Sequence, residues 1–193
     1  IQLNSNKNLL LNNTSYLITK NNQNYKIGYG LEVQEALFGE FGGLYVFGLS
    51  TDFDYRIENL PITFNINAFI GGGGGASAPD GSGLAYRHAY GIKTPLNPNI
   101  DFSLRYSNYS FPTGDISGSQ LQVGFSYLID SVFNTNFNKS KISKQSILVQ
   151  GVLMDLDIND SGRLDKDSYE TLISFEYANK LTENIDGLIR LQA

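Results

Sequence analysis

The chain has no cysteine and no tryptophan, and among its 193 residues there is one histidine and one methionine. Without cysteine there can be no disulfide framework, no thiol nucleophile and no thiolate metal ligand. The only histidine, His88, would have to serve alone in a Ser–His–Asp arrangement or a zinc site, which removes most designs of both kinds. These absences leave no convincing catalytic group, and we expect the protein not to be an enzyme.

Charge is also scarce, because charged residues make up 17% of the chain against about 25% in ordinary soluble domains. The net charge is -5, and lysine and arginine are scattered singly, whereas a nucleic-acid surface needs them clustered. We therefore exclude nucleic acid as a partner. The longest uncharged stretch, residues 59–79, contains two prolines and five consecutive glycines, so it cannot form a membrane-spanning helix.

What the chain has in abundance is alternation with a period of two residues, which is typical of β-strands. Between residues 43 and 57 one face carries Tyr45, Phe47, Leu49, Thr51, Phe53, Tyr55 and Ile57, and the other carries Gly48, Ser50, Asp52, Asp54 and Arg56. The same pattern recurs at residues 25–34, 62–71, 84–93, 100–107 and 121–129, and less cleanly at 8–20, 145–156, 169–178 and 184–192. The sequence predicts an all-β, antiparallel up-and-down meander of about 8–10 strands, forming a membrane β-barrel or part of one.

We divide the chain into four parts. Residues 1–23 are an N-terminal segment that could add a strand, 24–129 the main meander, 130–144 a polar linker, and 145–193 further hairpins that could begin a second half. Ten strands would place both termini at the end with the longer loops, and the chain ends on Leu191, Gln192 and Ala193 rather than on an aromatic residue. Either the first or last segment is not a barrel strand, or the chain is a piece of a longer protein, which we favour.

Two arrangements of the faces fit this pattern: a soluble sandwich with apolar faces inside, or a membrane barrel with apolar faces toward lipid. The polar faces are rich in glycine, serine and paired charges, which suit a narrow barrel interior. In the barrel, Phe47, Phe53, Phe64, Phe102 and Phe125 point outward. Asp52, Asp54, Arg56 and Arg105, with Glu32 and Arg87 nearby on the same face, are then expected to form a structural charge network inside, because buried charges need partners.

Residues 157–168 match the opening of a calcium-binding loop. Oxygen ligands fall at positions one, three, five and nine of the loop, which are Asp157, Asn159, Ser161 and Asp165, and glycine stands at position six. Position twelve is Ser168 rather than a bidentate glutamate, and the flanking segments are strands. The segment is therefore either a calcium site or an acidic hairpin loop, and we expect no other cofactor.

Several short segments resemble a group of Gram-negative outer-membrane β-barrel proteins that carry a glycine run in a hairpin loop. They are Phe69-Ile70 followed by glycines 71–75, Gly83-Leu84, Arg87-His88, Tyr106-Ser107 and residues 111–116. The resemblance implies a location in the bacterial outer membrane and a second, similar half further on. Lipid A deacylase barrels are similar in carrying a histidine two residues before a serine, but Arg105 holds that place before Ser107, so we reject that enzyme.

The leading hypothesis is an outer-membrane barrel with a structural, anchoring or partner-binding role through its long loops. Its partners would be membrane lipid, together with another envelope protein or a second half of the same protein. The alternative is a periplasmic or secreted β-sandwich that binds carbohydrate or another ligand. A barrel enzyme that acts on lipid is the third possibility.

Overall fold

The computed structural model describes residues 9–39, 43–75, 78, 80–131, 145–158, 172–182 and 185–192. This part of the chain forms ten β-strands. They are β1 (Leu9–Asn21), β2 (Tyr25–Gly39), β3 (Tyr45–Arg56), β4 (Thr63–Gly74), β5 (Leu84–Asn97), β6 (Ile100–Ser110), β7 (Ser117–Ser131), β8 (Gln145–Ile158), β9 (Leu172–Thr182) and β10 (Ile185–Gln192). No helix in the described part is long and apolar enough to cross a membrane.

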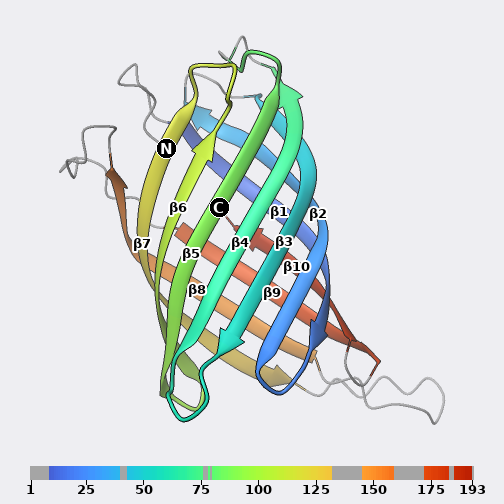
Figure 1. Ribbon diagram of the computed structural model, residues 1–193, viewed down its shortest axis with the longest axis vertical. Helices are drawn as coiled ribbons and strands as arrows, with labels where there is room; N and C mark the ends of the chain where they lie inside the picture. The colour runs from blue at the N-terminus through green and yellow to red at the C-terminus, as the bar shows by residue number, and fades with distance from the viewer. Residues whose placement is uncertain are drawn as a thin grey trace.

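The strands form one closed sheet in which each strand pairs with its neighbours in the chain (Figure 1). Closure comes from β1, which pairs antiparallel with β2 on one side and with β10 on the other. Tyr16, for example, lies opposite Leu31 of β2 and Ile189 of β10. The predicted all-β, up-and-down meander is confirmed, and the alternative of two stacked sheets is wrong because a single sheet curls onto itself.

The segments that looked marginal in the sequence are integral to this sheet. β1 lies within the expected N-terminal segment 1–23, and β8, β9 and β10 lie within residues 145–193. On either side of the expected linker 130–144, β7 pairs directly with β8, with Ser131 opposite Gln145. The main meander 24–129 is thus not a separate sheet, and both the first and the last segment are barrel strands. That the chain is a piece of a longer protein stays a prediction.

The barrel has two distinguishable ends. At the turn end, residues 22–24, 57–62 and 98–99 connect successive strands; this end is at the bottom of Figure 1. At the opposite loop end, residues 111–116 connect β6 to β7, β1 begins and β10 ends. Both ends of the strand array therefore lie on the loop end, as ten up-and-down strands require.

The glycine run in β4 lets the wall close tightly. A Cβ atom on Gly73 would lie 1.8 Å from the backbone oxygen of Tyr45, and one on Gly48 would lie 2.2 Å from the backbone oxygen of Ile70. Gly72 is different, because the nearest atom to its added Cβ is 3.9 Å away. Backbone atoms cannot give way as a flexible side chain can, so β3 and β4 approach this closely only because of glycine.

This contrast predicts opposite outcomes for two adjacent substitutions. Gly73→Ala should lower the free energy of unfolding by about 1–3 kcal/mol, the usual cost of forcing extra volume into a packed site. Gly72→Ala is the matched control and should change it by less than about 0.5 kcal/mol. Chemical denaturation of both variants measures the difference, and equal values would contradict the close approach of β3 and β4.

Candidate functional site

The outer wall of the barrel is apolar. Phe47 is 57% exposed and Leu49 is 60% exposed, although both are large hydrophobic side chains. Exposed large apolar side chains occur on β1 to β5, β7, β9 and β10. The outer face contains the phenylalanines expected there: Phe47, Phe53, Phe64 and Phe125 are exposed. Phe102 packs edge-on against Phe125, with ring centroids 5.6 Å apart.

The height of this apolar surface follows from strand geometry. On β3, apolar or hydroxyl-bearing side chains alternate outward from Tyr45 to Tyr55, which spans about 33 Å along the strand at about 3.3 Å per residue. A strand tilt of about 40° reduces this to about 25 Å along the barrel axis. Near the turn end, Tyr25, Tyr55 and Phe64 lie directly opposite one another on three neighbouring strands and form an aromatic row.

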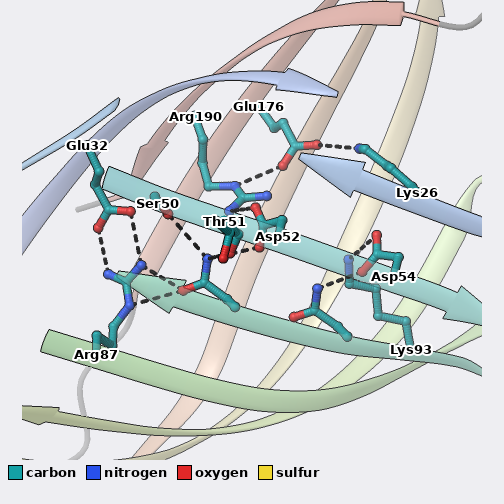
Figure 2. A network of polar contacts seen from close by, with 12 residues as sticks. Lys26, Glu32, Ser50, Thr51, Asp52, Asp54, Arg87, Lys93, Glu176 and Arg190 are labelled. Atoms are coloured by element: carbon teal, nitrogen blue, oxygen red, sulfur yellow. Dashed lines mark hydrogen bonds and ion pairs between the residues drawn. The ribbon is translucent and has the colours of Figure 1, made fainter. Parts of the chain in front are cut away.

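The interior of the barrel, its lumen, is polar and charged. Glu32 of β2 is almost fully buried, and Arg87 of β5 binds it with both terminal nitrogens, at 2.7 and 3.0 Å (Figure 2). β2 and β5 are not neighbours in the sheet, so this bidentate pair bridges the lumen. Two parallel charge-assisted hydrogen bonds are the strongest arrangement available to a guanidinium and a carboxylate.

Asn67 of β4 joins this pair to a second one. Its side-chain oxygen accepts hydrogen bonds from Nε and Nη2 of Arg87, at 3.2 and 2.8 Å. Its amide nitrogen donates to the carboxylate of Asp52 at 2.9 Å and to the backbone oxygen of Thr51 at 3.0 Å. Asn67 has no exposed surface, and its donor and acceptor are both used inside the lumen.

The second pair crosses from β3 to β10. Arg190 donates to Asp52 at 2.8 Å through Nη1 and to Glu176 of β9 at 3.0 Å through Nε. Lys26 lies 3.9 Å from Glu176. We call Glu32, Asn67, Arg87, Asp52, Arg190 and Glu176 the lumen network, whose hydrogen bonds and ion pairs Figure 2 shows.

The four residues expected to form a charge network are placed differently from one another. Asp52 lies in the lumen network, and Asp54 lies 3.6 Å from Lys93 and accepts a hydrogen bond from Asn65 at 2.6 Å. Arg56 is exposed at the turn end of β3 and forms no ion pair with a described acidic residue. Arg105 lines a cavity in the lumen instead. Asp52 and Asp54 thus each have a charged partner, but those partners, Arg190 and Lys93, lie outside the predicted set.

The partners that the sequence did not reveal are mainly Arg190 and Glu176. Both lie on the late strands, where alternation is weak. Arg190 reaches Asp52 only because the barrel closes, and Glu176 binds Arg190 from the neighbouring strand. The alternation of side chains along β10 could have identified Arg190. Leu188 is buried while Ile189 and Leu191 are exposed, so Arg190, two residues after Leu188, faces the lumen.

Apolar side chains fill the lumen at the loop end. Phe69, Tyr109, Phe111 and Ile116 are buried there in one cluster. The rings of Tyr109 and Phe111 meet edge to face, with centroids 5.6 Å apart, and the Arg87 guanidinium lies 5.7 Å from the Phe69 ring centroid. We call these four residues the apolar plug. Phe111 and Ile116 belong to the β6–β7 connection, which turns into the barrel. The backbone N–H of Phe111 donates to the backbone oxygen of Ile116 at 2.8 Å and closes this turn.

The candidate calcium loop lies outside the described residues, apart from the backbone of Asp157 and Ile158 at the end of β8. Calcium binding by Asp157, Asn159, Ser161 and Asp165 therefore stays a prediction. Among the residues that the structure describes, no cluster of three or more histidine, aspartate or glutamate side chains could hold a metal ion. His88 contacts the ring of Tyr90, at a centroid distance of 5.5 Å.

In the part of the chain that the structure describes, these features define a closed antiparallel β-barrel with a charged lumen and an apolar outer wall. Compared with models of protein families, with curated proteins and with solved structures, the chain has no significant match. The resemblance to Gram-negative outer-membrane barrels stays a prediction.

The lumen network predicts a large effect of removing one partner. Arg87→Ala leaves the Glu32 carboxylate buried without a counter-ion, and the free energy of unfolding should fall by about 3–5 kcal/mol. Arg56→Ala removes an arginine that is exposed and outside the network, so the change should stay within about 0.5 kcal/mol.

A double-mutant cycle separates the charge from the packing. Adding Glu32→Gln to Arg87→Ala should restore part of the loss, because no unpaired charge then remains in the lumen. Denaturant titration of the three variants gives the coupling. Additive losses would show that Glu32 and Arg87 do not depend on each other.

Proposed function

We propose that this protein is a bacterial outer-membrane β-barrel that acts as a structural or anchoring element and binds partners through its loop end. The observation that carries the proposal is the inverted polarity of the barrel. Buried side chains include Glu32, Asp52 and Asn67, whereas large apolar side chains such as Phe47 and Leu49 are exposed. In water, so large an apolar surface would be strongly unfavourable, whereas in lipid it is the surface that a barrel needs.

The dimensions support this proposal. Most of the strands have 11–15 residues, and β10 has 8, against about 9–11 residues for a tilted membrane-spanning strand. The apolar surface is about 25 Å high, which matches the lipid-facing band of such barrels. Each of the ten described strands also has a hydrogen-bonded neighbour on both sides, as spanning a bilayer requires.

A filled lumen favours a structural role over transport. The lumen network bridges strands across the interior, and the apolar plug occupies the loop end. In the part of the barrel that the structure describes, side chains packed in this way favour a filled interior over the water-filled path of a porin.

The loop end offers a defined surface for a partner. Ser82, in the β4–β5 connection, donates its backbone N–H to Oγ1 of Thr113 at 2.8 Å, and the two hydroxyls lie 2.7 Å apart. Asp80 accepts the backbone N–H of Gly83 at 3.0 Å. The Ser82–Thr113 contacts join two separate connections, and the Gly83–Asp80 hydrogen bond holds one of them in shape. A partner would therefore meet a surface that is already organised, which lowers the entropic cost of binding.

The absence of tryptophan makes the lipid-facing wall directly testable. Leu49→Trp places a single indole on the outer wall, and Gln23→Trp, the matched control, places one in the exposed turn between β1 and β2. In vesicles of lipids brominated deep in the acyl chains, fluorescence of Leu49→Trp should be quenched strongly and that of Gln23→Trp weakly. Equal quenching of the two variants, or a chain that folds fully without detergent or lipid, would sink the membrane proposal.

Conductance tests the structural role. Reconstituted in planar bilayers, the protein should give no steady ohmic conductance, because the lumen network and the apolar plug fill the interior. A water-filled porin measured in the same bilayers provides the comparison. Steady porin-like channels from this chain would instead assign it to transport.

A further inference from the structure

A cavity of about 70 Å³ lies in the lumen beside the lumen network. Its wall includes Asp52, Lys93, Asp101, Ser103, Arg105 and Ser126. Ser103 and Ser126 are buried and short, so β6 and β7 leave open the space that long charged side chains fill on the other side of the barrel. Since about 15 Å³ suffices for one water molecule, the cavity has room for a small ion.

Arg105 is the notable group in this wall. Its Nε is buried without a hydrogen-bond partner, and it forms no ion pair with an acidic side chain that the structure describes. Asp52 and Glu32, two acids whose charges act on it, already bind Arg190 and Arg87 at 2.8 and 2.7 Å. Lys93, in the same wall, lies 3.6 Å from Asp54. Among the acidic side chains that the structure describes, these pairings thus leave none in a salt bridge with Arg105.

A guanidinium withdrawn from bulk water is costly unless an anion or hydrogen-bond acceptors compensate it. Its planar fork of N–H donors matches the two oxygens of a carboxylate. The carboxylates of Asp52, Asp101 and Glu176 lie in the same wall, and they would repel a second negative charge. These features together select a small anion with one charge over a dianion such as sulfate.

We propose that the cavity is an anion site in which Arg105 binds one small monovalent carboxylate of the size of formate or acetate. The proposal uses only the interior of the barrel and does not depend on the location of the protein in a membrane. A negative result in the bromolipid experiment would leave it standing, and its own failure would leave the membrane proposal standing.

The direct test observes the Nε–Hε signals of the arginine side chains by NMR on the full folded chain in detergent micelles. The Arg105 signal can be assigned through bonds from its own backbone, so no variant is needed. Sodium acetate is titrated at constant ionic strength, which is maintained with a sulfonate buffer too large for the cavity. The Arg105 signal should shift and saturate, whereas the signal of exposed Arg56 should show no saturable change.

Unfolding temperatures provide a second measurement. Acetate at ten times its Kd should raise the unfolding temperature of the wild type by about 3–5 °C, because a ligand bound only by the folded state stabilises it. Arg105→Gln should abolish that rise and Arg56→Gln, the matched control, should retain it. Sulfate at equal ionic strength should give less than half of the rise.

Three results would overturn the proposal. They are an Arg105 signal that moves linearly without saturation, an acetate effect of equal size in Arg105→Gln and the wild type, and stabilisation by sulfate equal to that by acetate. If Arg105→Gln does not fold, the wild-type titration decides the question alone.

Discussion

The hydrogen-bonded pairing of β1 with β10 is the constraint on which the rest of the structure depends. It joins the first described strand to the last, with Asn13 opposite Gln192 at one end of the ladder and Lys20 opposite Ile185 at the other. Once the sheet is closed, each strand has an inside and an outside, and each described strand has a neighbour on both sides. The inside of a ten-stranded ring is narrow, so its side chains have to be small or have to satisfy one another.

The lumen network meets this demand with bonds between strands that are not neighbours. Glu32 and Arg87 connect β2 to β5, and Asp52 and Arg190 connect β3 to β10. Buried pairs of this kind recover little more than the cost of desolvating their charges. Their effect on register is larger, because a slip of one residue would move Asp52 from the lumen to the outer wall. The lumen network thus fixes the register of the strands, and the closed sheet in turn brings the partners of the network together.

The two ends of the lumen differ in chemistry, which bears on how the protein would work. The apolar plug closes the loop end, while the charged residues and the cavity beside Arg105 lie further from it. With side chains packed inside in this way, most of the contacts that the protein can make are on its surfaces. In the functions proposed above, the outer wall meets lipid, the joined connections at Ser82 and Thr113 meet a partner, and the cavity holds a small anion.

The sequence by itself determined the strands and their faces, because alternation is a local property of the pleated backbone. Phe47 outside and Asp52 inside follow from the period of two residues alone. Local pattern could not supply the partners: Asp52 and Arg190 are 138 residues apart and meet only when the sheet closes. The alternation along β3 places Arg56 on the inward face, but its position at the end of the strand exposes it to solvent. Phe111 and Ile116 have no alternation to mark them, since a turn folds them into the lumen. The tertiary structure alone decided the partners of Asp52, the solvent exposure of Arg56 and the apolar plug, because each depends on where distant strands lie around the ring.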